Sequence, residues 1–210
     1  MARQTRERIL ETSLTMFNAQ GEPNVTTNHI ADELGISPGN LYYHFRSKGD
    51  IVEHLFARYE ANVGDALLLP DGRAPNLEDV WLQLHLVFES LWSYRFLYRD
   101  LVDILARNRK LKLRFARIMN RAASSATDLL RGLVRAGVMR ASADEIRALA
   151  ENILLVATFW MSFDAVRGGK TEAGEADLNR GIHRVMMLIA PFLRDAERYH
   201  LNTLAATYVR

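Results

Sequence analysis

Apolar side chains recur every three or four residues along most of the chain, and this spacing constrains the fold more than any other feature. Such a period gathers apolar residues on one face of a helix, whereas a half-buried strand needs strict alternation. The sequence contains no strand-like alternation and no internal repeat. Glycine and proline, the helix breakers, number only 12 and 5 among 210 residues. The sequence therefore predicts an all-α protein.

Capping and breaking residues divide this pattern into separate expected helices. Ser37 followed by Pro38 is a strong helix start, and two further starts read as capping boxes, at Ser47 and at Ser142. The expected helices cover about 5–20, 27–34, 38–44, 47–66, 76–92, 96–106, 110–136, 142–166 and 176–193. A turn-rich break at 70–75 suggests three parts: an N-terminal domain over 1–48, a connecting helix and loop over 49–75, and a second domain over 76–210.

Composition excludes several classes of protein. The chain has no cysteine, which excludes disulfide scaffolds, thiolate metal sites and cysteine nucleophiles and suits a reducing cytosol. The longest uncharged apolar stretch, Ile153–Phe163, is shorter than the ~20 residues of a membrane span, so we expect a core helix and no membrane partner. The N-terminus does not resemble a signal peptide. No nucleotide-binding or nucleophile-elbow motif is present, and the six histidines lack ligand spacing, so we expect no enzyme, metal or cofactor.

The expected helices 27–34 and 38–44 are separated by a tight turn, which is a helix-turn-helix pattern. Gly35 ends the first helix and lies in the turn. The expected buried residues of this part are Ile30, Ala31, Leu34 and Ile36. In such a motif the second helix presents its N-terminal residues to base edges in the major groove of DNA, while the first helix crosses the phosphate backbone.

The residue types of this segment also suit contact with DNA. Hydroxyl, imidazole and ammonium groups would bind phosphates, and a glycine would let the backbone approach the duplex. These candidates are Thr27, Ser37, Gly39, Tyr42, Tyr43, His44 and Lys48. We expect Asn40 to read adenine, and Pro38 and the tyrosine rings to contact thymine methyl groups. We expect Leu41 and Phe45 to be plain core residues, whereas burial of the polar tips of Tyr42 and His44 would need partners that the sequence does not supply.

The run Ile30–Lys48, with Gly21 nine residues before it, resembles the DNA-binding signature of the TetR family of bacterial transcriptional regulators. The resemblance covers about residues 5–55. It implies an all-helical homodimer with a three-helix DNA reader and a larger C-terminal domain that binds a small molecule and dimerises. It also implies a ligand-responsive regulator, most often a repressor that binds a palindromic operator. The family's DNA-contact positions fall on the seven candidates given above.

Three residues depart from the family pattern, and the charge of the reader is balanced. Ser13 stands where alanine is usual, Glu22 where an aromatic residue is common, and Gly49 where an acidic residue is usual. We expect these departures to affect packing more than DNA reading. Residues 1–48 contain five basic and five acidic residues, so their formal charges cancel. Non-specific attraction to DNA should therefore be modest, and specific binding should depend on close geometry.

The C-terminal part contains two clusters of aromatic residues, within 81–98 and 159–163. A single aromatic residue at helix spacing is more often a core residue than part of a binding site. Two clusters in one helical domain nevertheless favour an apolar cavity, and the resemblance implies that a ligand occupies it. The expected lining residues are Trp92, Phe96, Tyr98, Phe115, Met119, Phe159, Trp160 and Phe163. The expected effector is a small apolar or amphipathic molecule, and an acidic head group is one form that it could take. Segments 96–101 and 150–160 are similar to a branch with regulators of fatty-acid and polyhydroxyalkanoate metabolism.

A stripe of basic residues follows one face of the expected helix 110–136, at positions 110, 114, 117 and 121. A solvated surface is the more common meaning of such a stripe, and attraction of an anionic ligand to the pocket mouth is the alternative. Helices 142–166 and 175–194 are apolar on more sides than one domain covers, which favours a four-helix dimer interface.

The sequence thus favours a ligand-responsive, DNA-binding transcriptional regulator. An all-helical enzyme is the second hypothesis, and a helical interaction module without DNA binding is the third. The segment from Ser37 to His44 argues against the third hypothesis, because its residue types suit a nucleic-acid surface.

Overall fold

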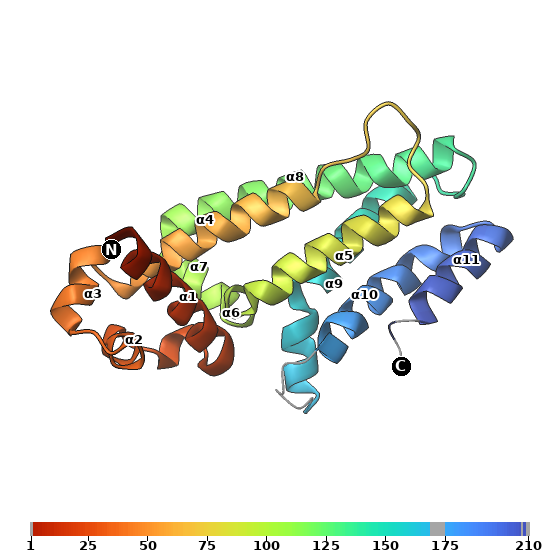
Figure 1. Cartoon of the computed structure of the whole chain (residues 1–210). Helices are drawn as coiled ribbons and strands as arrows, with labels where there is room; N and C mark the ends of the chain where they lie inside the picture. Colours follow the sequence, from red (N-terminus) through yellow and green to blue (C-terminus); the bar gives the residue numbers. More distant parts are fainter. Residues whose placement is uncertain (1, 169–174, 207, 209–210) are drawn as a thin grey trace. The chain divides into compact units, whose positions relative to one another are not determined.

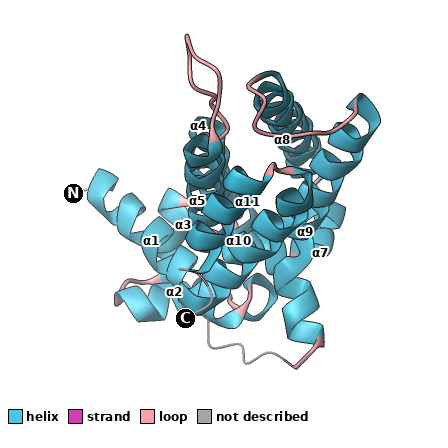
Figure 2. Cartoon of the chain, turned by 90° about the vertical axis from the view of Figure 1, so that its right-hand side faces the viewer, coloured by secondary structure: helices cyan, strands magenta, loops and turns pink. Residues whose placement is uncertain are grey.

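The computed structural model describes residues 2–168, 175–206 and 208, and within these ranges it contains helices and no strand (Figures 1 and 2). A single isolated bridge joins Met139 to Leu193. The all-α fold is therefore confirmed. The α-helices are α1 (Ala2–Gln20), α2 (Thr27–Leu34), α3 (Pro38–His44), α4 (Lys48–Ala66), α5 (Leu77–Ser93), α6 (Arg95–Arg99), α7 (Leu101–Arg107), α8 (Arg109–Arg135), α9 (Ala143–Val166), α10 (Glu175–Ile189) and α11 (Asp195–Ala206), and two 3₁₀ turns cover Glu22–Asn24 and Ala190–Phe192.

Two of the expected helices were drawn wrongly from the sequence. The helix expected over 96–106 is split into α6 and α7 at Asp100, whose backbone (φ −106°, ψ 20°) is not helical. The carboxylate of Asp100 accepts a hydrogen bond from the backbone N–H of Glu22, a distant contact that local periodicity does not reveal. The last expected helix ends at Ile189, because Pro191 follows in a 3₁₀ turn, and α11 was not expected at all. The break after the helix 142–166 is expected at Gly168 and Gly169: α9 does end at Val166 and Gly168 has a left-handed backbone (φ 77°), whereas Gly169 lies outside the described residues.

The chain divides into two compact units. The first unit comprises Met1–Asn62 and Ser93–Arg114, and the second comprises Val63–Trp92 and Phe115–Arg210. Thus α6, α7 and the first turns of α8 pack with the N-terminal helices, although they follow α5 in the chain. The domain boundaries expected at 48 and 75 divide the chain into consecutive segments, whereas each compact unit combines segments that are separate in the sequence. Those boundaries stay a prediction.

Aromatic rings fill the core of the first unit. Phe17 of α1 lies 5.3 Å from the ring of Phe96 of α6. Tyr59 of α4 contacts the rings of Tyr94 and Tyr98, each with centroids 5.9 Å away, and its hydroxyl is hydrogen-bonded to that of Tyr98. Burial raises the pKa of both the Tyr59 and the Tyr98 hydroxyls, so both stay neutral at physiological pH. These contacts hold α6 against α1 and α4.

The core of the second unit forms where α5, α9 and α10 meet. The ring of Trp160 lies 6.2 Å from that of Phe88 and 6.4 Å from that of Trp92. Gly181 of α10 faces this cluster, and a Cβ atom there would lie 2.4 Å from a carbon of the Phe88 ring. A glycine is therefore required for α10 to approach α5 this closely.

One described helix, α9, is long and apolar enough to span a membrane by length and composition, a test that core helices of soluble proteins also pass. The sequence favoured a core helix at this place, yet much of α9 is exposed. Four large apolar side chains lie exposed on it: Leu155, Phe159, Phe163 and Val166. Their spacing of three or four residues places them along one side of the helix.

Candidate DNA-binding interface

The helix-turn-helix is built from local capping interactions. The backbone N–H of His29 donates to the Thr26 hydroxyl (3.2 Å), and the His29 ring accepts from the Thr26 N–H (3.4 Å), which fixes the start of α2. Gly35 ends α2 with a left-handed backbone (φ 64°), and the N–H of Ile36 donates to the Ala31 carbonyl. This sharp reversal sets the direction of α3.

Burial in this segment follows the prediction closely. Ile30 and Ala31 of α2 are fully buried, as are Leu41 and Phe45, the two residues expected to be plain core. Leu34 and Ile36 are half-buried and not fully buried as expected, because they lie at the turn where α2 ends. The core residues thus lie on one side of α3.

The first turn of α3 exposes the side chains expected to read DNA. Ser37 caps the helix by accepting the N–H of Asn40 (3.2 Å), and Pro38 occupies the first helical position. The exposed candidates are Ser37, Pro38, Gly39, Asn40, Tyr42 and Tyr43, and the half-buried ones are Thr27, His44 and Lys48. The structure therefore gathers these residues, from α2, α3 and the start of α4, within one three-helix unit.

The two tyrosines of α3 differ in their surroundings. The hydroxyl of Tyr42 is 3.1 Å from that of Thr27, so this hydrogen bond ties α3 to α2. Tyr43 exposes 80% of its surface, and its ring lies 5.1 Å from that of His44. Its ring and hydroxyl are therefore accessible to a partner.

Lys48 has intramolecular contacts that the sequence did not predict. Its ammonium donates to the Glu22 carbonyl (2.8 Å) and lies 3.1 Å from the Glu22 carboxylate. Arg107 of α7 reaches the other carboxylate oxygen of Glu22 at 2.8 Å. Glu22 was expected to affect packing more than DNA reading. The available signal was an acidic residue at a position that the family usually fills with an aromatic ring.

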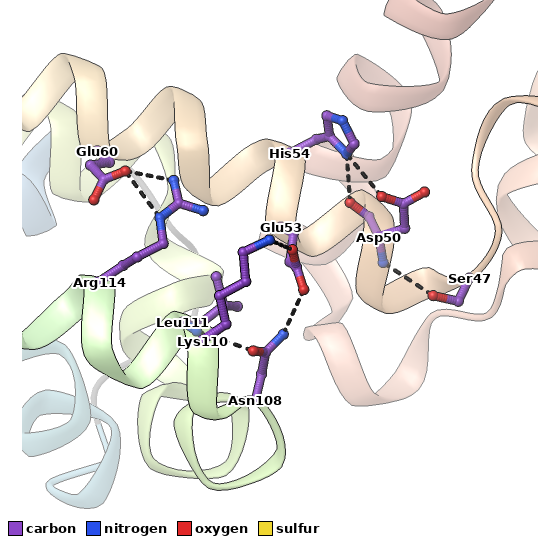
Figure 3. A network of polar contacts seen from close by, with 9 residues as sticks. All are labelled: Ser47, Asp50, Glu53, His54, Glu60, Asn108, Lys110, Leu111 and Arg114. Carbon is purple, nitrogen blue, oxygen red and sulfur yellow. Dashed lines mark hydrogen bonds and ion pairs between the residues drawn. The ribbon is translucent and has the colours of Figure 1, made fainter.

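Two residues of the basic stripe of α8, Lys110 and Arg114, pair with acidic groups of α4 (Figure 3). In the first unit Lys110 is 2.7 Å from Glu53, and Arg114 is 2.5 Å from Glu60. Asn108 adds a hydrogen bond to Glu53 (3.1 Å). Hydrogen bonds from Lys110 and Asn108 hold the pKa of the Glu53 carboxyl below its usual value. Lys110 and Arg114 therefore fasten the start of α8 to α4, a role that differs from both the solvated surface and the attraction of an anionic ligand considered for the stripe.

The eight residues expected to line a ligand site fall in both units. Phe96 and Tyr98 belong to the core of the first unit. In the second unit Trp92 and Trp160 are stacked, and the Thr158 hydroxyl lies 4.0 Å from the sulfur of Met119. Phe115 is buried, whereas Phe159 and Phe163 are 43% and 53% exposed. Phe88, which belongs to the aromatic cluster 81–98 but not to the expected lining residues, also contacts the Trp160 ring.

Comparisons with known protein families assign both parts of the chain. The family model described as "Bacterial regulatory proteins, tetR family" matches residues 9–55, and the one described as "Bacterial transcriptional repressor" matches residues 58–201. The chain belongs to the TetR family of bacterial transcriptional regulators. It is a helix-turn-helix DNA-binding protein, and the resemblance noted in the sequence is confirmed.

Individual relatives agree with this assignment. A solved TetR-family regulator from Marinobacter aquaeolei VT8 is 39% identical, with a TM-score of 0.88 and coverage of 98% of this chain and 99% of that chain. The HTH-type transcriptional regulator AcrR of Shigella flexneri is 31% identical over 74 residues, which are 35% of this chain and 34% of that protein. The match to this curated relative thus spans about a third of its length. The SmeT–triclosan complex shares the fold, with a TM-score of 0.60 and 20% identity over 91% of this chain and 93% of that chain.

Proposed function

We propose that this TetR-family chain binds a palindromic operator as a homodimer and represses transcription until a small apolar effector releases it. The observation that carries the proposal is the exposure of Asn40, Tyr42 and Tyr43 on the short capped helix α3. Asn40 would read adenine, and Thr27, Ser37, Tyr42, Tyr43, His44 and Lys48 would bind phosphates. Gly39 would let the backbone approach the duplex, and Pro38 would contact a thymine methyl group.

The proposed dimer forms through α9 and α10, so that the operator mirrors the twofold symmetry of the protein. Its support is the exposed apolar stripe of α9, which would otherwise lie in water. At the end of this stripe Asp164 pairs with Arg184 of α10 (2.6 Å), and the Arg184 guanidinium lies 5.5 Å from the Phe163 ring. This pairing holds α9 and α10 together, so each subunit offers two helices to a four-helix interface.

The operator can be identified by repeated selection of bound duplexes from a random DNA pool with the purified full-length chain. A symmetric motif with two half-sites is expected from the wild-type protein. The Asn40→Ala variant should select a motif with relaxed preference at one base pair of each half-site, because bidentate contacts to adenine carry discrimination of about 1–3 kcal/mol. Selection of no motif, or of an asymmetric single site, would contradict the proposal.

The proposed effector site is centred on the stacked Trp92 and Trp160 in the second unit, with Phe115 and Met119 of α8 as further lining residues of that unit. The indole N–H of Trp160 is buried and has no hydrogen-bond acceptor among the described residues, so an effector with an acceptor oxygen would fit it. The triclosan bound in the related SmeT fold supports a small apolar molecule. Phe159 and Phe163 would lie at the edge of this site. Phe96 and Tyr98 are buried in the core of the first unit, so they would respond to the effector without contacting it. The similarity to fatty-acid regulators stays a prediction.

A thermal-shift screen of apolar metabolites, followed by release of the selected operator duplex, tests this site. An effector must bind the two conformations of the repressor with different affinities, since equal affinity shifts no equilibrium. We expect a stabilising compound to release the operator and to lose affinity for the Trp160→Ala variant. A compound that binds the variant as tightly as the wild type would refute the location of the site, and one that binds without releasing DNA would refute the switch.

A further inference from the structure

Glu22 is the most deeply buried carboxylate near the DNA-reading helices. Its side chain is 5% exposed, and it lies in the turn between α1 and α2. A buried charge is costly unless it is paired and hydrogen-bonded. Glu22 meets this condition with two cations from other elements, Lys48 at the start of α4 and Arg107 at the end of α7.

The turn that carries Glu22 is also held by its backbone. Its N–H donates to the carboxylate of Asp100 (3.1 Å), and Arg99 donates to the carbonyl of Phe17 (2.8 Å), at the end of α1. Arg107 is in turn paired with Asp103 (2.6 Å). The position of the Glu22 carboxylate is therefore fixed from several sides, so this carboxylate is a rigid anchor for whatever it binds.

Lys48 is the partner whose position matters for DNA. An ammonium has three N–H donors, and Lys48 donates one of them to the Glu22 carbonyl while it forms an ion pair with the Glu22 carboxylate. A donor remains for a phosphate, and the side chain is still 25% exposed. A lysine on a flexible four-carbon stem loses much rotamer freedom when it binds an anion, and a lysine that is already held loses less.

We propose that Glu22 is a positioning residue for DNA binding, because its buried carboxylate holds the Lys48 ammonium in place with one donor directed to an operator phosphate. This inference rests on the proposed function, in which Lys48 contacts DNA. Electrostatics alone gives the opposite expectation, since removal of a negative charge near DNA should strengthen binding. The sign of the effect therefore separates positioning from simple repulsion.

The test compares operator affinity in a double-mutant cycle of Glu22→Gln and Lys48→Met, measured by fluorescence anisotropy on the selected duplex. Glu22→Gln should weaken binding about three- to tenfold when Lys48 is present, which is the cost of ordering one long side chain. In the Lys48→Met background the same change should have an effect of less than about twofold. The matched control is Glu7→Gln, which removes one negative charge and one ion pair with α4 (Arg58, 2.6 Å) without touching Lys48. It should not weaken binding.

A second measurement does not depend on DNA. Reductive methylation of the free protein, followed by mass spectrometry, should modify Lys48 more slowly than the exposed Lys112 in the wild type, and Glu22→Gln should remove much of this protection.

The inference would be overturned if Glu22→Gln bound the operator as tightly as the wild type or more tightly. It would also be overturned if Glu22→Gln lost as much operator affinity in the Lys48→Met background as it does when Lys48 is present. If the wild type bound no operator, the proposed function would fail. Equal methylation of Lys48 and Lys112 would instead refute the anchoring itself.

Discussion

Tyr43 illustrates what a single residue contributes to the proposed interface. It exposes 80% of its surface, so its substitution removes almost no packing. Tyr43→Ala should therefore leave the free energy of unfolding within about 0.5 kcal/mol of the wild type. It should weaken operator binding about tenfold or more, because a hydrogen bond to a charged phosphate contributes about 1.5–3 kcal/mol. Urea denaturation and fluorescence anisotropy measure the two quantities.

A second exposed tyrosine provides the control for Tyr43. Tyr199 of α11 is 77% exposed and lies in the other unit, so Tyr199→Ala removes a similar surface group away from the reader. It should bind the operator like the wild type. If the Tyr43→Ala variant bound the operator as tightly as the wild type, the Tyr43 ring would not face the phosphate backbone.

At the residue scale, side chains whose role depends on local geometry were predictable. The exposure of Tyr42 and Tyr43 and the burial of Leu41 and Phe45 follow from where each lies on a short capped helix. The contacts of Glu22 were not predictable, because its partners lie 26 and 85 residues further along the chain. Local patterns do not contain such pairs.

At the scale of helices and turns, capping and breaking residues in the sequence located most helix starts and ends well. The Ser142–Glu145 capping box is present in both directions. Gly137, where the expected helix 110–136 stops, has a left-handed backbone (φ 74°), and the Val138 N–H donates to the Leu133 carbonyl, which caps the end of α8. The start at Ser47 forms only half a box, since the Asp50 carboxylate accepts the N–H of Arg46. Tertiary contacts explain what the signals missed, as at Asp100.

The pairing of α8 with α4 gives a prediction for acid stability. Because the folded-state pKa of Glu53 is lowered by its bonds to Lys110 and Asn108, the charged form stabilises the fold above the unfolded pKa of about 4.5, and this stabilisation is lost as pH falls through the lower folded value. Glu53→Gln should thus cost up to about 1 kcal/mol of unfolding free energy at pH 7, and this difference should shrink below pH 4.5. Urea denaturation at several pH values measures it. A difference independent of pH would contradict the ion-pair explanation.

At the scale of the whole molecule, the exposed apolar stripe of α9 predicts self-association. Leu155→Asp should shift the dimer toward monomer at micromolar concentration, because it places a charge in the proposed apolar interface. Sedimentation equilibrium measures the shift. Val102→Asp, at a residue 74% exposed on α7, introduces the same charge elsewhere and should leave the dimer intact. A wild-type protein that is monomeric at micromolar concentration would contradict the dimer.

The sequence alone could predict the all-helical architecture and the helix-turn-helix, since these depend on periodicity, caps and a specific motif. It could not predict that Phe96 and Tyr98 complete the core around Phe17 and Tyr59, because that requires knowing which helices become neighbours. For the same reason the basic stripe of α8 was recognised as a pattern without its partners on α4.

The most direct test of the central claim, sequence-specific DNA binding, is fluorescence anisotropy of the full-length protein with DNA upstream of its own gene. The comparison is a scrambled duplex of equal length and composition at physiological salt, because affinities for DNA depend steeply on ionic strength. The account predicts that the upstream duplex binds at least about 1,000-fold more tightly than the scrambled one. Equal affinity for the two duplexes would contradict it.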